Sequence, residues 1–192
     1  MERSSGERRA LRVEAWHRPP TPTEVELLAH LPAPVLDVGC GPGRIAAALA
    51  ADGVPALGID VAPAALARAA GAGAAVLDRS IFDPLPGEGR WGSALLLDGN
   101  IGIGGDPARL LARLHELLRP DGLALVEVDG FGASTTVDRV RLRCSTRGTG
   151  PWFDWAWLAA DDVHRLGASA GFGDVQIEAH GHRHFARLRR VG

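Results

Sequence analysis

Residues 39–43, with the sequence GCGPG, form the part of the chain with the clearest chemical meaning. Glycine lets the backbone pass close to a ligand and lets main-chain amides point toward it. Two carboxylates accompany this loop: Asp37 stands just before it, and Asp60 follows at the end of another apolar stretch. A carboxylate in the place of Asp60 can accept hydrogen bonds from both hydroxyls of a ribose. The set predicts a site for a ligand that contains a nucleoside.

Two ligands fit this much of the pattern, a nicotinamide dinucleotide and S-adenosylmethionine. The dinucleotide fingerprint has glycines at its first, third and sixth positions, but the sixth position counted from Gly39 is Arg44, a bulky residue where close helix–sheet packing favours glycine. Asp37 would repel a diphosphate, whereas it attracts a ligand that carries an ammonium and a sulfonium group. The residues therefore favour S-adenosylmethionine as the cofactor.

The elements around the loop alternate between strands and helices. We expect strands at 35–38, 56–60, 74–77, 93–97 and 123–128, and helices at 23–31 (with Thr23 as the N-cap), 45–51, 63–70 and 107–118. Later in the chain we expect an inserted strand pair at 137–144 and 152–158, a helix at 161–170, and closing strands at 175–179 and 185–188 joined at Gly181. Such alternation is typical of a parallel sheet with helices on both faces.

Three segments resemble the motifs of class I S-adenosylmethionine-dependent methyltransferases. VLDVGCGPG at 35–43 matches the first motif of that family almost residue for residue, LGIDV at 57–61 resembles the second, and LLRPDGL at 117–123 resembles the turn before the fifth strand. The resemblance covers residues 33 to 130 most closely. It implies an α/β fold: a doubly wound, mostly parallel seven-stranded sheet (the Rossmann-like methyltransferase fold), with a small inserted strand pair in the C-terminal third.

The resemblance also implies an enzyme that transfers a methyl group from S-adenosylmethionine to an oxygen, nitrogen or carbon of a small-molecule acceptor. The residues that it places at the cofactor are Asp37, Gly39, Cys40, Gly41, Asp60, Val61, Ser80, Ile81, Asp98, Gly99 and Asn100. Two positions depart from the family pattern. Ser80 stands where the family often has an acidic residue that reads adenine, so we expect its hydroxyl or the Ile81 amide to meet that edge. Gly92 stands where an Asp often follows the aromatic residue.

We expect residues 1–192 to form a single domain. In it, residues 1–32 form an N-terminal cap segment, 33–130 the cofactor-binding core, and 131–192 the substrate-side insertion and closing strands. Residues 1 to about 12 are highly charged and are expected to be mobile. The loop 98–105, DGNIGIGG, is expected by resemblance to face the methionine end of the cofactor, and its four glycines predict a close backbone approach.

Methyl transfer chiefly needs positioning of the acceptor, and sometimes a base. His17 lies beside Trp16 in the segment that by resemblance can cover the cofactor, and it is one candidate base. Glu127 and Asp129 end the fifth strand, where substrates often bind, although a carboxylate there could equally belong to a structural ion pair. We take Asp129, which is nearer the end of the strand, together with His17 as the candidate catalytic residues.

Three further clusters have two interpretations each. His180, His182 and His184 alternate as strand ligands of a metal would, but Gly181 interrupts them and no acidic cluster accompanies them, so we expect no metal. Arg139, Arg141 and Arg143 could hold an anionic substrate group or form the solvated face of an edge strand. Trp152, Phe153, Trp155 and Trp157 could pack in the core or line an aromatic substrate wall.

The composition excludes several kinds of chemistry. All 21 basic residues are Arg, and the chain has no Tyr. Without Lys there is no Schiff base and no phosphate-loop lysine, and a Tyr-Lys dehydrogenase site cannot be built. The net charge of −2 gives no reason to expect nucleic acid or a membrane as a partner. Two cysteines and a polar N-terminus favour a reducing cytoplasm. The oligomeric state stays open.

Two other functions remain as alternatives. The first is a module with the methyltransferase fold that binds the cofactor without catalysing transfer, which the departures at Ser80 and Gly92 leave open. The second, less favoured because of Arg44, is an NAD(P)-dependent oxidoreductase. A nucleic-acid methyltransferase is weaker still, because the Arg139–Arg143 stripe is short and the base-modifying motif of Asn or Asp, two prolines and an aromatic is absent.

Overall fold

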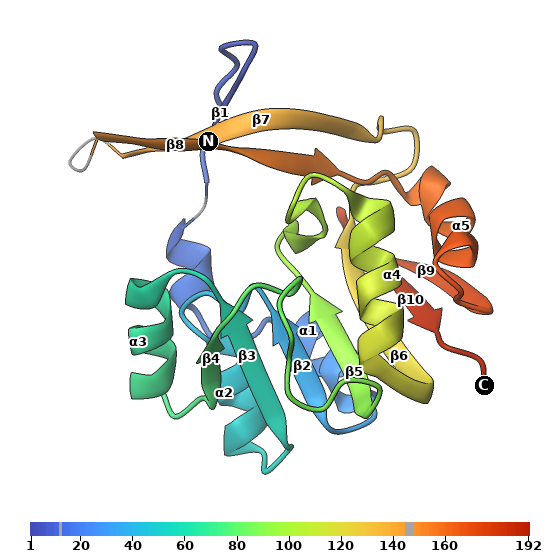
Figure 1. Ribbon diagram of the computed structural model, residues 1–192. Coiled ribbons are helices and arrows are strands. Elements are labelled where there is room, and N and C mark those ends of the chain that lie inside the picture. The colour runs from blue at the N-terminus through green and yellow to red at the C-terminus, as the bar shows by residue number, and fades with distance from the viewer. Residues whose placement is uncertain (12, 145–147) are drawn as a thin grey trace.

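The computed structural model describes residues 1–11, 13–144 and 148–192. The large sheet is built from β2 (Val35–Val38), β3 (Ala56–Asp60), β4 (Val76–Asp78), β5 (Trp91–Leu96), β6 (Leu118–Val128), β9 (Asp174–His180) and β10 (Arg183–Arg189). Their order is β4-β3-β2-β5-β6-β10-β9. The five strands from β4 to β6 are parallel, and β10 runs antiparallel to both of its neighbours (Figure 1). The predicted, mostly parallel seven-stranded sheet is confirmed.

Helices cover both faces of this sheet, and the sheet separates the two main clusters of buried apolar residues. The helices are α1 (Pro22–Ala29), α2 (Arg44–Ala51), α3 (Pro63–Gly71), α4 (Pro107–Leu117) and α5 (Ala160–Ser169), with the short 3-10 helices η1 (Val13–His17) and η2 (Asn100–Gly102). Alternate residues of the strands face opposite sides: Leu36 packs with the leucines of α4, whereas Val35 packs with α1 and α2. Leu110, Leu114 and Leu117 recur at helical spacing and are fully buried, which explains why α4 forms.

The N-cap of the first long helix lies two residues earlier than predicted, so its assignment to Thr23 is wrong. Thr21 is the cap: its hydroxyl accepts the Glu24 amide at 3.3 Å, while the Glu24 carboxylate accepts the Thr21 amide at 2.8 Å. This reciprocal capping box, followed by Pro22 at the first helical position, fixes the start of α1. The helix ends at Ala29 rather than Leu31.

A second, antiparallel sheet has the strand order β1-β7-β8. Its strands are β1 (Glu2–Arg3), β7 (Thr136–Cys144) and β8 (Gly148–Trp157), so the predicted inserted strand pair is confirmed. The expectation that the first residues are mobile is wrong for β1. The Glu2 carboxylate accepts hydrogen bonds from Arg141 at 2.6 Å and from Arg143 at 3.1 Å, which attaches this end of the chain to β7.

The small sheet lies across the edge of the large sheet at which the parallel strands end (Figure 1). Trp155 of β8 forms a bridge with Ile103, in the loop that follows β5. A Cβ at Gly102 would overlap the Trp155 indole and the Ala156 carbonyl, and a Cβ at Gly105 would lie 2.7 Å from the Asp154 Cβ. The close backbone approach predicted for this loop therefore exists, but the partner at these two glycines is the chain itself.

Among the described residues, no helix combines the length and the apolar character that crossing a membrane requires.

The contact between Gly102 and β8 leads to a stability prediction. Gly102→Ala should lower the free energy of unfolding by about 1–3 kcal/mol, because the new methyl group meets the Trp155 ring and the Ala156 carbonyl. Gly71→Ala, at the end of α3 with no atom within 4 Å of the added Cβ, is the matched control and should be neutral or slightly stabilising. Urea denaturation of both variants measures the difference, and equal stabilities would contradict the packing of β8 on this loop.

Candidate functional site

The glycine loop joins β2 to α2 and is open at its middle. The amides of Gly39 and Cys40 donate to the Ile59 carbonyl at 2.9 and 3.0 Å, which holds the start of the loop against β3. Gly41 has φ +54°, and no atom lies within 4 Å of the position that a Cβ would occupy there. Gly43, with φ +83°, lets α2 pass directly against Ala69 of α3. The loop is thus fixed at both ends and exposes its backbone between them.

Asp60, at the end of β3, is oriented by the backbone around it. Its Oδ2 accepts the Gly41 amide at 2.8 Å, and its Oδ1 accepts the amides of Val61 and Ala62 at 2.7 and 2.9 Å. Val61 itself is 66% exposed. Asp78, which ends β4 in register with Asp60, is an exposed carboxylate at the same edge. Sequence reasoning did not single out Asp78, because the resemblance directed attention to Ser80.

Cys40 contributes to the loop through packing. Its side chain is buried, and its sulfur lies close to Gly58 of β3, where a Cβ would come within 2.7 Å of Sγ. Burial, and then the charges of Asp37 and Asp60, raise the pKa of the Cys40 thiol. Cys40 therefore stays protonated, and it leaves the ligand side of the loop to the backbone.

Asp37 is buried below the loop. It is 4% exposed, and among the described residues none donates a hydrogen bond to its Oδ2. Burial raises its pKa to about 7, against the lowering effects of Arg44 and of a hydrogen bond from the Ala46 amide. The carboxyl group therefore changes charge near neutral pH.

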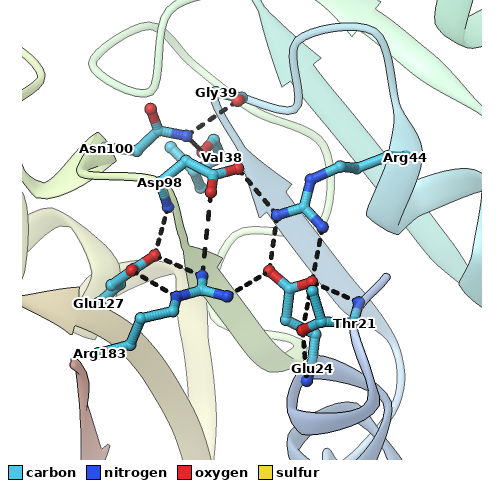
Figure 2. Close-up of polar contacts among 9 residues, drawn as sticks. All are labelled: Thr21, Glu24, Val38, Gly39, Arg44, Asp98, Asn100, Glu127 and Arg183. Carbon is cyan, nitrogen blue, oxygen red and sulfur yellow. Dashed lines mark hydrogen bonds and ion pairs between the residues drawn. The ribbon is translucent and has the colours of Figure 1, made fainter. Parts of the chain in front are cut away.

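The loop after β5 is tied to the glycine loop (Figure 2). The Asn100 side-chain amide donates to the carbonyls of Val38 and Gly39 at 3.0 and 2.9 Å. A Cβ at Gly39 would lie 2.6 Å from Asn100 Nδ2, so this position requires glycine. Gly99 has φ +83°, and a Cβ placed there would meet no atom within 4 Å. Asn100 thus holds two loops side by side, and Gly99 leaves space beside them.

Five charged residues form a closed ring beside this loop, which we call the charge ring (Figure 2). Arg44 donates to the Glu24 carboxylate at 2.7 and 2.8 Å and to Asp98 Oδ2 at 2.9 Å. Arg183 binds both Glu127 oxygens at 2.7 and 2.8 Å and donates to Glu24 at 2.9 Å. Glu127 closes the ring by accepting the Asp98 amide at 2.7 Å. The members come from α1, α2, β6, β10 and the loop after β5.

The ring settles one open interpretation and adds two residues that sequence reasoning missed. Glu127 belongs to an ion pair, as one of its two interpretations proposed. Glu24 and Arg183 were not foreseen. Burial raises the pKa of Glu24, but hydrogen bonds from Arg44 and from the Thr21 amide outweigh it and bring that pKa to about 2. The only signal in the sequence was the Thr21-to-Glu24 spacing of a capping box, which predicts a helix start and no ion pair.

Neither of the two candidate catalytic residues is a member of the charge ring. His17 is an exposed residue at the end of η1. Asp129 directly follows β6. Its amide donates to the Leu158 carbonyl at 2.8 Å, and its own carbonyl accepts the Ala160 amide at 2.9 Å.

The two residues predicted to meet adenine lie beyond β4. The Ser80 hydroxyl accepts the Phe82 amide at 3.3 Å, and the Ile81 carbonyl accepts Arg113 Nε at 3.1 Å. Their roles toward a ligand stay predictions.

The histidine cluster does not assemble. Arg183 pairs with His180 and His184 pairs with Ala179, so His180 and His184 lie on opposite faces of the hairpin. No group of three or more metal-binding side chains occurs in the part of the chain that the structure describes.

The arginine stripe and the tryptophans are largely engaged with each other and with the N-terminus. β7 lies between β1 and β8, so the expected edge strand is an interior one. Arg141 lies 4.5 Å from the centre of the Trp152 ring, and Arg3 stacks in the same way on Trp157.

Gly92, where the family often has Asp, packs directly against the backbone that precedes β2. A Cβ at this position would overlap the carbonyls of Pro32 and Ala33.

The burial of Asp37 leads to a pH prediction. Between about pH 4, where an unfolded Asp ionises, and the raised native pKa of about 7, the unfolded chain binds fewer protons at Asp37 than the native protein. Asp37 therefore reduces stability progressively as the pH rises through this window. The free energy of unfolding of Asp37→Asn, measured against the wild type by urea denaturation, should rise from pH 4 to 7. Asp52→Asn, at an exposed position, controls for the exchange itself, and a constant difference for Asp37→Asn would contradict the protonated buried state.

Comparisons with known proteins agree with this architecture. A sequence model described as a methyltransferase domain matches residues 18–177. A search of curated protein sequences gives no significant match. Among solved structures, an S-adenosylmethionine-dependent methyltransferase from Bacteroides fragilis, in complex with S-adenosyl-L-homocysteine, is 23% identical with a TM-score of 0.79, and the match covers 99% of this chain and 86% of that chain.

Two further structures extend the comparison. The 1,6-didemethyltoxoflavin-N1-methyltransferase of Burkholderia thailandensis is 25% identical with a TM-score of 0.64, over 93% of this chain and 80% of that chain. The CcbJ methyltransferase of Streptomyces caelestis is 16% identical with a TM-score of 0.69, over 92% of both chains. Because the family match spans most of the sequence, from before α1 into β9, this chain belongs to the methyltransferase domain family.

Proposed function

We propose that this protein is an S-adenosylmethionine-dependent methyltransferase that acts on a small molecule. The observation that carries the proposal is the hydrogen-bonded arrangement of the glycine loop, with Asp60 on one side and Asn100 on the other. The B. fragilis and B. thailandensis structures, which contain S-adenosylhomocysteine, support the same cofactor here. Membership of the methyltransferase family supports catalysis over a purely binding module.

The residues fit this cofactor. The open position at Gly41 admits a ligand against the backbone. Asp60 would accept a ribose hydroxyl with the one lone pair, on Oδ2, that its three amide donors leave unused. Val61, Ser80 and Ile81 would border the adenine, with Asp78 as a further carboxylate at that edge. Gly39, Cys40, Asp98, Gly99 and Asn100 would border the amino-acid end, with Asp37 beneath them.

When bound, S-adenosylmethionine supplies a methyl group that is already activated by its sulfonium. The chain therefore has to bind, orient and exclude water, and where the acceptor carries a proton it has to remove that proton. With no Lys and no Tyr in the sequence, a side-chain base is restricted to His, Asp, Glu or Cys. We propose Asp129, at the end of β6, and His17, in the segment before α1, for that role.

The acceptor belongs to the part of the site formed by the loop after β6. Phe131, two residues beyond Asp129, is 61% exposed and packs edge-on against His184 at 5.7 Å between ring centres. An exposed aromatic ring two residues from a carboxylate suits an organic acceptor with an apolar surface and a polar group. The B. thailandensis enzyme, with bound 1,6-didemethyltoxoflavin, is a methyltransferase of similar fold that acts on a small heterocycle.

We further propose that residues 1–192 act as one domain in the cytoplasm, without a nucleic-acid or membrane partner. Contacts between distant segments support a single unit: Glu24 of α1 binds Arg183 of β10, and β1 pairs with β7. The net charge of −2 supports the absence of a polyanionic partner.

Binding of S-adenosylhomocysteine tests the cofactor. Isothermal titration calorimetry should detect binding to the wild type, and Asp60→Asn should weaken it roughly tenfold, because one charge-assisted acceptor for the ribose is lost. Asp52→Asn, which removes an exposed carboxylate at the end of α2, should bind as the wild type does. Absence of binding to the wild type at millimolar ligand, or stabilisation by NAD instead, would overturn the proposal.

Release of S-adenosylhomocysteine from S-adenosylmethionine, measured over a panel of small heterocyclic acceptors, tests the acceptor side. For an acceptor that is turned over, Asp129→Asn should lower kcat by roughly a hundredfold or more while cofactor affinity stays unchanged. Glu116→Gln, on the exposed side of α4, is the control and should leave kcat unchanged. A wild-type kcat for Asp129→Asn would exclude Asp129 as the base and leave His17→Ala as the next variant.

A further inference from the structure

The loop after β6, residues 129–135, is held by hydrogen bonds to the start of α5. The Gly132 amide donates to Asp161 Oδ2 at 2.7 Å, and the Thr135 hydroxyl accepts the Ala159 amide at 3.1 Å. Each of these bonds involves a main-chain amide, so the path of the loop is defined. The side chains that the loop presents therefore start from a fixed backbone.

Among the described residues, no cation pairs with Asp129, the first residue of this loop. Glu127, two residues earlier, binds Arg183 through both oxygens at 2.7 and 2.8 Å, and Arg183 Nη1 donates to Glu24 at 2.9 Å. All three nitrogens of that guanidinium are thus engaged. Asp129 is half-buried, and an ion partly removed from water is stabilised by a partner of opposite charge. Its carboxylate is therefore available to a cationic ligand.

An exposed aromatic ring belongs to the same loop. Phe131 is 61% exposed, and His184 packs against it in a T shape with 5.7 Å between the ring centres. The His184 ring also lies against Gly130, where a Cβ would come within 3.0 Å of His184 Cε1. These contacts hold the Phe131 ring in place while much of its surface stays open. The π-face of an aromatic ring carries partial negative charge and attracts cations.

Asp129 and Phe131 lie outside the part of the site proposed above for the cofactor. The groups proposed for the cofactor belong to β2 or follow β2, β3, β4 and β5, whereas these two residues follow β6. In the sheet, β5 separates β6 from β2. Neighbouring strands are about 4.8 Å apart, so the end of β6 lies about 10 Å from β2, the strand that leads into the glycine loop. The carboxylate and the ring are therefore placed for the methyl acceptor.

We propose that the acceptor is a basic amine, bound as an ammonium ion by the Asp129 carboxylate and the Phe131 ring. This inference rests on the proposed function and names the class of substrate on which that function acts. An ammonium group donates a charge-assisted hydrogen bond to the carboxylate and interacts favourably with the aromatic face. An alcohol would leave Asp129 without a counter-charge, and an anionic acceptor would be repelled by it.

Methyl transfer to an amine balances without a further reactant. The bound ammonium gives one proton to the Asp129 carboxylate, and the lone pair released in this way forms the new bond to the methyl carbon. The electron pair of the broken carbon–sulfur bond stays on sulfur, which becomes a neutral thioether. The nitrogen ends with the positive charge, and Asp129 passes its proton to water.

Three probes on one skeleton separate the effect of charge from that of shape. 2-Phenylethylamine is a cation at neutral pH, 2-phenylethanol is neutral, and 3-phenylpropanoate is an anion. Each is titrated by nuclear magnetic resonance into the full chain saturated with S-adenosylhomocysteine, which has no methyl group to donate. The wild type should bind the amine roughly tenfold more tightly than the alcohol, as a charge-assisted hydrogen bond predicts, and the anion more weakly than either.

Two variants and two controls assign this preference to the loop. Asp129→Asn should reduce the preference for the amine to about twofold, the part that the Phe131 ring supplies. Phe131→Leu should weaken binding of the amine roughly threefold and keep the order of the probes. Asp52→Asn, at the end of α2, and Trp152→Leu, which removes an exposed ring stacked with Arg141 on β8, should bind all three probes as the wild type does.

The outcomes separate this inference from the proposed function. A wild type that does not bind S-adenosylhomocysteine overturns the proposed function and the inference with it. If S-adenosylhomocysteine binds, but the amine at millimolar concentration binds no better than the alcohol, the amine acceptor is overturned and the cofactor assignment stands. The same conclusion follows if Asp129→Asn, with its affinity for S-adenosylhomocysteine intact, keeps the wild-type preference.

The products of the acceptor panel give an independent readout. Every acceptor that is turned over should carry its new methyl group on a basic nitrogen, a position that mass spectrometry and nuclear magnetic resonance identify. A product methylated on oxygen or carbon would overturn the amine acceptor.

Discussion

The site depends on one buried carboxylate. Glu24 is 1% exposed, and an ionised group at such a depth is tolerated only when it is paired and fully hydrogen bonded. Its two oxygens accept from Thr21, Arg44 and Arg183, and these three donors belong to different elements. Satisfying Glu24 therefore brings α1, α2 and β10 to one point. The loop after β5 joins them there through Asp98 and Glu127, and Asn100 carries the arrangement on to the glycine loop.

The sequence was sufficient to predict the large sheet, for identifiable reasons. The valines and the leucine of 35–38 favour a buried strand, and the leucines of α4 recur at helical spacing. The turn expected at 120–122 is wrong: these residues belong to β6, which begins at Leu118 and whose pairing with β5 shifts register between Trp91 and Ser93. The glycine loop and Asp60 are predictable from local sequence. The glycines stand between a strand and a helix, and Asp60 stands at the end of the next strand. The hydrogen bond from the Gly41 amide to Asp60 then joins two segments that the parallel order of β2 and β3 makes neighbours.

The remaining features depend on contacts between distant residues, which leave no local pattern. Glu24 and Arg183 are far apart in the sequence, and each alone is typical of a solvated surface. Glu2 was assigned to a mobile tail because nothing near it marks a strand, yet Arg141 and Arg143 bind it from β7. Glycines were informative about close approach but not about the partner. Gly102, in a loop expected to approach the cofactor, accommodates Trp155 instead. Gly92, where the family often has Asp, accommodates the backbone before β2.

The position of β10 has a consequence for the order of events when the chain is synthesised. This strand follows the other described strands in sequence, but in the sheet it lies between β6 and β9. Arg183, its first residue, is a counter-charge for both Glu24 and Glu127. On the ribosome, where segments emerge from the N-terminus onward, those carboxylates must stay hydrated until β10 inserts. The nascent chain therefore completes the charge ring in a late step, and a chain released before β10 is made would lack the counter-charge of Glu24 and Glu127.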